Sequence, residues 1–195
     1  MSRVPERPSM IRGESVYLRA AERDDLPLFV RWLNDAAVTR HLMAHAPMSM
    51  VAEEQWFTRM LEAQGKTDYH FVICLLAGGT PIGTAGLHDV RPRSGHAEFG
   101  IAIGEPDQWS RGYGTDALRA ICDFGFGELR LERIELHVYA SNERARRSYG
   151  KAGFVHEGTL RRAHFSRGEH EDVHVMSLLR DEWLALPHHR SWEYD

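Results

Sequence analysis

The chain has 195 residues, of which 43% are hydrophobic and 27% charged, and its formal net charge at pH 7 is −4. These values are typical of a globular protein, and the length suffices for one well-buried core. Its 24 Lys and Arg are outnumbered by 28 Asp and Glu and form no basic block, so we expect no nucleic-acid partner.

The cysteines and the N-terminal sequence bear on the compartment. Cys74 and Cys122 each lie inside an apolar run, as buried free thiols do in a reducing compartment. The opening sequence MSRVPERPSM lacks the apolar core of a signal peptide. Nor does any stretch approach the ~18 uninterrupted apolar residues of a membrane-spanning helix. We therefore expect a soluble, cytoplasmic protein with no membrane partner.

The first part of the chain is predicted to form a strand and then two helices. Residues 15–21 alternate like a strand, and residues 23–35 carry apolar side chains at helical spacing. A second amphipathic helix is expected over 50–65, with Gly65 as its stop signal. Its apolar side is predicted to comprise Trp56, Met60 and Leu61.

Three consecutive strands are expected next. Residues 70–90 read as two strands about a turn at Gly78 and Gly79. Residues 96–104 alternate again, and Gly100 is expected to form a bulge. One face of this strand would carry Ala97, Phe99, Ile101 and Ile103, and the other Glu98, Gly100 and Ala102.

The rest of the chain is predicted to alternate helices and strands. Residues 133–140 alternate like a strand, and the helix after them would be capped by Ser141 or Asn142 and ended by Gly153. The last two strands are expected within 155–165 and 172–180, about a turn near Gly168. We expect one domain over 10–186, with peripheral tails at 1–9 and 187–195.

The loop within QWSRGYGTDAL, which opens another helix, is predicted to bind an anion. A helix N-terminus presents unpaired N–H groups and the positive end of the helix dipole. Gly112 and Gly114 would let a diphosphate approach the backbone. Arg111 would add a positive charge beside it, and Ser110 and Thr115 would offer hydroxyl groups. The alternative is that the two glycines serve only the turn.

Other common sites are not indicated. A P-loop would place Lys after Gly114, where Thr115 stands, and a dinucleotide fingerprint would place its third glycine at Ala117. The chain has 12 histidines, but no HExxH or cysteine-paired spacing, so we expect no metal. It also has no Gly-x-Ser-x-Gly elbow of a serine hydrolase.

Two motifs resemble those of a known family. WSRGYGTDAL resembles the pyrophosphate loop of the GNAT-type N-acetyltransferases, and NERARRSYGKAGF resembles their second motif. The resemblance runs from about Met10 to Trp183, and its branch is similar to the ribosomal-protein N-terminal alanine acetyltransferases. It implies a mixed α/β fold in which helices cover both faces of a mostly antiparallel sheet, splayed at the cofactor strand. It also implies acetyl-CoA, or another short acyl-CoA, as co-substrate, and suggests a homodimer.

The resemblance implies where the cofactor binds. The strand ending in Ile101, Ala102 and Ile103 would lie along the pantetheine arm, and Asn142 would hydrogen-bond that arm. Trp109 stands where the family loop often has Gln or Arg, so phosphate binding would depend more on backbone N–H groups and Arg111. The loop residues expected to bind the cofactor are Arg111, Gly112, Tyr113, Gly114 and Thr115.

Acetyl transfer to an amine needs a base and an acid. By the same resemblance Tyr149 would protonate the leaving thiolate; without the motif, a tyrosine at helical spacing suggests packing. Glu98 is the candidate base, with His88 and water as alternatives. Adjacent His88 and Asp89 should point to opposite faces of a strand and so make a poor dyad.

The acceptor is the least determined part of the site. The branch resemblance favours a peptide or protein N-terminus, whose α-amine pKa of ~7.7 to 8.0 asks little of the base. A polyamine, an aminoglycoside or another small amine is the alternative, as is a non-catalytic acyl-CoA-binding module. The early acidic residues Asp24, Asp25, Asp35, Glu53 and Glu54 are interspersed with arginines and predict no acidic pocket.

Overall fold

The structure is a computed structural model and describes residues 11–42 and 46–194. The N-terminal tail expected over 1–9, and residue 10, at which the expected domain begins, lie outside these residues. The strands are β1 (Ile11–Arg12), β2 (Val16–Ala20), β3 (Tyr69–Leu75), β4 (Pro81–Arg91), β5 (His96–Ile103), β6 (Arg133–Tyr139), β7 (Val155–Ser166) and β8 (Glu169–Leu179). The α-helices are α1 (Leu26–Leu33), α2 (Ala36–Thr39), α3 (Met50–Ala63), α4 (Tyr113–Asp123), α5 (Glu143–Lys151) and α6 (Arg180–Ala185).

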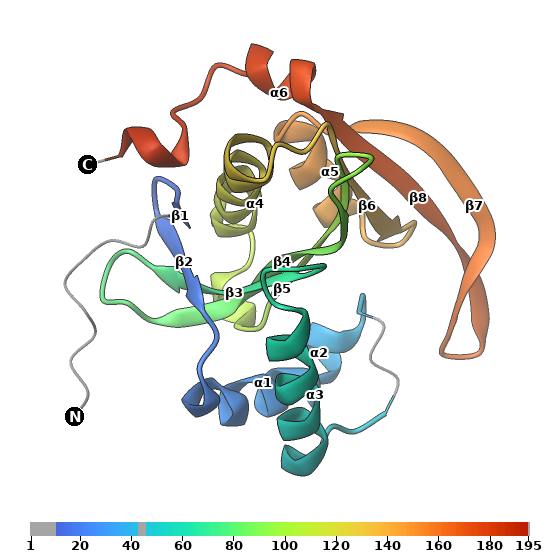
Figure 1. Ribbon diagram of the computed structural model, residues 1–195. Helices are drawn as coiled ribbons and strands as arrows, with labels where there is room; N and C mark the ends of the chain where they lie inside the picture. The colour runs from blue at the N-terminus through green and yellow to red at the C-terminus, as the bar shows by residue number, and fades with distance from the viewer. Residues whose placement is uncertain (1–10, 43–45, 195) are drawn as a thin grey trace.

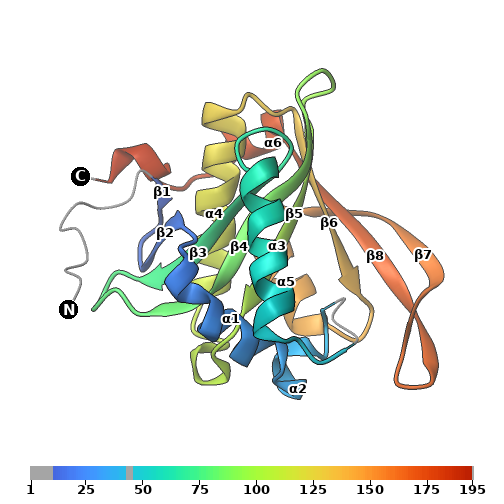
Figure 2. The same ribbon diagram turned by 60° about the horizontal axis from the view of Figure 1, so that its bottom comes forward.

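One eight-stranded sheet in the order β1-β2-β3-β4-β5-β6-β8-β7 forms the centre of the molecule. Every neighbouring pair is antiparallel except β5 and β6, which are parallel. Helices α1 and α3 lie on one face of the sheet and α4 on the other (Figures 1 and 2). This is the mixed α/β fold that the sequence predicts.

Each face of the sheet has its own apolar core. Phe29 and Trp32 of α1 pack with Phe57 of α3 over Val72 and Cys74 of β3. The larger core, on the other face, joins α4 to the sheet. Its fully buried large side chains include Leu18, Ile73, Leu87, Leu118, Ile121, Phe126, Ile134 and Leu136.

The parallel pair separates soon after it forms. His96, Ala97 and Glu98 of β5 are in register with Arg133, Ile134 and Glu135 of β6, and no later residue of β5 pairs with β6. From Phe99 to Ile103, β5 stays paired with β4 alone, and the last residues of β6 pair with β8 alone. The splay opens an unpaired strand edge on each side, as the sequence predicts for a cofactor strand.

The expected bulge at Gly100 is not present. Gly100 is in regular register with Gly86, and the register shift between β4 and β5 lies between His88 and Arg91, where Asp89 has φ of 48°. A glycine is suited to position 100 for a different physical reason, because a Cβ there would lie 3.1 Å from Nε2 of His88. The glycine makes room for that imidazole ring.

The apolar side of α3 also differs from the expected one. Met60 is buried, but Leu61 is 52% exposed and faces solvent. The buried stripe of the helix runs through Glu53, Phe57 and Met60, which are spaced by four and three residues. Leu61 lies outside that stripe.

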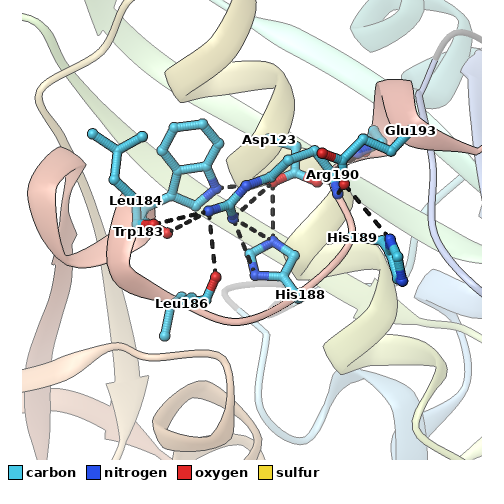
Figure 3. Close-up of polar contacts among 9 residues, drawn as sticks. Asp123, Trp183, Leu184, Leu186, His188, His189, Arg190 and Glu193 are labelled. Carbon is cyan, nitrogen blue, oxygen red and sulfur yellow. Dashed lines mark hydrogen bonds and ion pairs between the residues drawn. The ribbon is translucent and has the colours of Figure 1, made fainter.

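The C-terminal segment is bound more closely than the expected peripheral tail (Figure 3). Buried Asp123, the last residue of α4, accepts hydrogen bonds from Trp183 Nε1 at 2.8 Å and from the backbone N–H of Ser191 at 2.8 Å. His188 Nε2 lies 3.1 Å from Asp123, and the Arg190 guanidinium stacks over the Trp183 ring at 4.2 Å. Hydrogen bonds to the buried carboxylate of Asp123 thus hold residues 188–191 against the domain.

The other end of α4 is held by the N-terminal hairpin. Asp116, in the first turn of α4, accepts hydrogen bonds from the backbone N–H groups of Glu14, Ser15 and Val16 at 2.8 to 3.0 Å.

None of the helices in the described ranges is long and apolar enough to cross a membrane.

Candidate active site

The splay between β5 and β6 opens into a cavity of about 730 Å³. One end is lined by Phe99 to Ile103 of β5, the loop before α4 and the inner side of α5. The other end is lined by α2 and by the β7–β8 hairpin, which extends beyond the rest of the sheet (Figure 1). The cavity brings together all the predicted site residues except Arg111 and the alternative base His88.

The β5 edge offers free backbone groups to a ligand. Ile101, Ala102 and Ile103 line the cavity on the side where β6 has moved away. The carbonyl oxygen of Ile103 already accepts a hydrogen bond from Trp109 Nε1 at 2.9 Å. An extended, amide-bearing chain can therefore bind to this edge as an added strand, up to Ile103.

The N-terminus of α4 points a turn of unpaired N–H groups at the same cavity. Gly112 is the N-cap residue, with φ of 87°, so it provides no side-chain cap for the first turn. Tyr113, Gly114 and Thr115 follow and line the cavity. The Thr115 hydroxyl lies 2.6 Å from the Ser148 hydroxyl and so joins α4 to α5. This end of the helix can hold an anion.

The cations at this end come from α5. Arg111 is exposed and does not line the cavity, whereas Arg144, Arg147 and Lys151 do. These three positions are spaced by three and four residues and therefore share one face of α5. Arg144 also stacks over the Trp109 ring at 4.3 Å. The helical spacing within NERARRSYGK is a signal from which these cations could have been predicted.

Asn142 and Tyr149 occupy the two ends of α5. The Asn142 side chain accepts a hydrogen bond from the Ala145 N–H at 3.2 Å, which confirms Asn142 as the helix cap. Tyr149 is half-buried between the rings of Phe99 and Phe154, each 6.4 Å away, and it also lines the cavity. Burial raises the pKa of the Tyr149 hydroxyl to about 12. The hydroxyl is therefore protonated at neutral pH.

A carboxylate and an imidazole face each other where the strands part. Glu98 Oε1 of β5 lies 3.2 Å from Nδ1 of His137 on β6, and both residues line the cavity. Both side chains are partly open to solvent, with 43% and 38% exposure. His137 was not among the sequence-predicted residues, although it alternates with the buried positions of its strand, as a cavity-facing residue should.

His88, the alternative base, has a different partner from the one considered in the sequence. Its Nδ1 lies 3.2 Å from Oδ1 of Asp68, whereas Asp89 pairs with Arg91. The His70 ring lies 4.7 Å away, and burial together with His88 lowers the pKa of His70 to about 4. His88 does not line the cavity, so Glu98 is the better placed of the two candidate bases.

The comparisons with known proteins now bear on this geometry. Residues 15–155 match the family model described as "Acetyltransferase (GNAT) domain". The chain belongs to the GNAT acetyltransferase family. It is therefore an N-acetyltransferase that uses acetyl-CoA as its acetyl donor, rather than a non-catalytic binding module.

Three similar proteins cover nearly the whole chain. An uncharacterized N-acetyltransferase p20 of Bacillus licheniformis is 29% identical over 88% of this chain and 97% of its own. The spermidine N(1)-acetyltransferase of Escherichia coli (strain K12) is 29% identical over 90% of this chain and 92% of its own. A crystal structure of the spermidine N-acetyltransferase from Vibrio cholerae in complex with CoA and spermine superposes on this structure with a TM-score of 0.80. Its sequence is 27% identical, and the match covers 87% of this chain and 98% of that one.

These relatives support the GNAT family but do not single out the ribosomal-protein branch that the sequence resembles. They likewise leave the homodimer and the cytoplasmic location as predictions. For a GNAT enzyme, the splayed β5 edge, the α4 N-terminus and the cavity-facing cations of α5 form one continuous surface at which a CoA thioester can bind.

The end of the cavity beside α2 and the β7–β8 hairpin is mainly apolar and also carries imidazole side chains. The His164 ring stacks on Tyr139 at 3.9 Å, and the buried Nδ1 of His41 has no hydrogen-bond partner within residues 11–42 and 46–194. Leu42 and Leu160 add apolar surface. Among the described residues that line the cavity, Glu98 is the only carboxylate.

Proposed function

We propose that the enzyme transfers the acetyl group to a primary amine that carries a single positive charge, a peptide or protein N-terminus. The observation that carries the proposal is that Glu98 is the only carboxylate among the described lining residues. A charge removed from water needs a partner of opposite sign, so one carboxylate suits one ammonium group. A polyamine carries several ammonium groups and would need several carboxylates.

The acidic residues of the early helices do not change this count. Asp25 is bound by Arg19 at 2.7 Å, and Asp35 caps α2 by accepting a hydrogen bond from the Ala37 N–H. Glu53 is buried on the sheet side of α3. None of the three lines the cavity.

The proposed position of acetyl-CoA follows from the cavity. The pantetheine arm would bind along the free edge of β5 from Phe99 to Ile103, and its amides would pair with the strand backbone. The diphosphate would lie at the α4 N-terminus beside Gly112 and Gly114, where N–H groups and the helix dipole favour negative charge. Arg144, Arg147 and Lys151 would compensate the remaining phosphate charge.

Glu98 is proposed as the base, acting directly or through a water molecule. The acceptor ammonium loses a proton to Glu98, whose carboxylate lies beside the His137 imidazole. An α-amine pKa of ~7.7 to 8.0 means that this deprotonation costs little near neutral pH. The amine nitrogen then attacks the thioester carbon, which forms the C–N bond and expels the CoA thiolate.

Tyr149 is proposed to donate its hydroxyl proton toward the departing sulfur. Its pKa of about 12 lies about 3.5 units above the ~8.5 of a thiol, so complete transfer alone would be uphill by about 5 kcal/mol. The hydroxyl therefore acts mainly as a hydrogen-bond donor to the developing thiolate. The hydroxyl proton of Tyr149 moves fully to the sulfur only as the attacking nitrogen loses its remaining extra proton.

Spermidine is the second candidate acceptor, and a specific observation favours it. Two of the similar proteins, from Escherichia coli and Vibrio cholerae, are spermidine acetyltransferases by name. They share about the same identity with this chain over most of their length. The chemistry at Glu98 and Tyr149 would be the same, and only the acceptor end would differ.

The deciding experiment compares acceptors under identical conditions. Acetyl-CoA consumption is measured with a short peptide bearing a free N-terminus, the same peptide with a blocked N-terminus, and spermidine. We expect the free peptide to have the highest kcat/KM and the blocked peptide to be inert. A higher kcat/KM for spermidine, or equal rates with free and blocked peptides, would reject the N-terminal acceptor while leaving the acetyltransferase assignment intact.

A further inference from the structure

A second group of chemistry-bearing side chains lies outside the cavity. Asp68, His70 and His88 each contribute one potential ligand atom, and these atoms all lie within 4.8 Å of one another. The residues come from the turn before β3, from β3 and from β4. We propose that this cluster is a binding site for a borderline divalent cation of the Zn²⁺ type.

The donor set fits such an ion. Two imidazoles and one carboxylate are a common set for zinc, with metal–ligand distances of about 2.0 to 2.2 Å. In a tetrahedral site two such donors are about 3.4 Å apart, and Asp68 Oδ1 and His88 Nδ1 are already 3.2 Å apart. The third donor, from His70, lies within 4.8 Å of both.

Neighbouring groups contact the Asp68 and His70 side chains. The Thr67 hydroxyl donates a hydrogen bond to Oδ2 of Asp68 at 2.7 Å, which leaves Oδ1 directed to His88. The backbone N–H of His70 donates a hydrogen bond to the Gln64 side chain at 2.9 Å, which holds the main chain at this position, and the Trp56 ring packs edge-on against the His70 ring at 5.5 Å. Such supporting contacts orient ligands and strengthen metal sites.

The site is reachable and is separate from the cofactor surface. Asp68 and His88 side chains are 25% and 35% exposed, so an ion can enter from water and keep a water ligand. The Nε2 side of His88 faces Gly100 of β5, whereas Nδ1 faces Asp68 on the opposite side of the ring. The ion would thus bind without entering the cavity, and acetyl transfer needs no chemistry from it.

Zinc titration of the chelator-treated, metal-free full chain tests the proposal by isothermal calorimetry. We expect one specific site that is weakened at least about tenfold by each of Asp68→Asn, His70→Ala and His88→Ala. His96→Ala and His174→Ala are matched controls, because these histidines also lie on strands but outside the cluster, and they should keep the site. The visible absorption of bound Co²⁺ provides a second readout.

Folding of each variant is checked by its melting temperature and by the rise that CoA causes. Asp68→Asn keeps the shape of the side chain and one acceptor oxygen but removes the charge, so it tests the site even where loss of the His70 ring against Trp56 disturbs folding. Absence of binding to the wild-type chain would overturn the proposal and leave an ordinary carboxylate–imidazole hydrogen bond. Equal affinity in Asp68→Asn and the wild type would likewise place the ion elsewhere.

Discussion

Glu98 of β5 and His137 of β6 meet at 3.2 Å, at the point where the two parallel strands separate. Glu98 is the last residue of β5 that is in register with β6, so its side chain stands at the inner corner of the cavity. The splay that exposes the β5 backbone therefore also presents a carboxylate to the cavity. One feature of the sheet thus supplies both the donor surface and the candidate base.

If Glu98 is the base, Glu98→Gln should lower kcat and remove or displace the acidic limb of the pH–rate profile, because an amide cannot accept the ammonium proton. Steady-state kinetics across pH measure this directly. Glu135→Gln is a matched control on the neighbouring strand, since Glu135 is in register with Glu98 but does not line the cavity. An unchanged acidic limb in Glu98→Gln would exclude the carboxylate.

Tyr149→Phe should lower kcat by about 10 to 100-fold while leaving the affinity for CoA nearly unchanged, because the hydroxyl acts mainly in the transition state. Turnover assays and CoA binding by calorimetry separate the two effects. Tyr69→Phe serves as the control, because Tyr69 packs on Phe124 and does not line the cavity. Full turnover in Tyr149→Phe would leave Tyr149 as a packing residue.

The raised pKa of Tyr149 makes a prediction about alkaline pH. Its protonated form, which is the hydrogen-bond donor, persists below a pKa of about 12 and is lost only as pH rises through that value. The wild-type kcat should therefore show no decline from this group near pH 10, where a free tyrosine of pKa ~10 would titrate. An alkaline limb near pH 10 that is absent in Tyr149→Phe would contradict the assignment.

Gly112→Val should abolish the rise in melting temperature that CoA causes, because a branched side chain at φ of 87° disturbs the turn that opens α4. Gly78→Val is the matched control: Gly78 has φ of 86°, a Cβ there meets open space as it does at Gly112, and it lies in the β3–β4 turn. Both variants carry the same backbone strain. A normal CoA shift in a folded Gly112→Val protein would place the diphosphate elsewhere.

Asp123→Ala should destabilise the fold, because Trp183, His188 and Ser191 would lose their shared buried partner. Breaking a buried polar cluster of this kind costs about 3 kcal/mol or more, which for a chain of this size is at least about 6 °C in melting temperature. Thermal unfolding measures it, with Glu54→Ala on the exposed side of α3 as control. A shift equal to that of Glu54→Ala would mean that the C-terminal segment adds no stability.

Features written in local patterns could be predicted from the sequence. Alternation located the strands at 96–104 and 133–140, and the cap and stop signals placed α5 between Asn142 and Gly153. The glycine loop and the second motif both line the cavity in which we propose that the cofactor binds. These features depend on residues that are close together in the chain.

Features that depend on distant residues could not be predicted in this way. The pairing of Asp68 with His88 spans two strands and matches neither the HExxH nor the cysteine-paired pattern. The partners of Asp123 lie 60 to 68 residues away and show no periodicity. Arg111 stays a predicted phosphate ligand from its position in the motif, but its side chain is exposed and does not line the cavity, whereas cations of α5 do.

Both ends of α4 are held by the ends of the chain. Asp116 receives the N–H groups of residues 14–16, Asp123 receives Trp183, His188 and Ser191, and the Arg12 guanidinium lies 5.2 Å from the centre of the Tyr194 ring. The helix that bears the predicted diphosphate site is thus positioned by segments far outside the cofactor motifs. A truncation that removes residues 14–16 or 183–191 is therefore expected to disturb the predicted diphosphate site, although neither segment belongs to a cofactor motif.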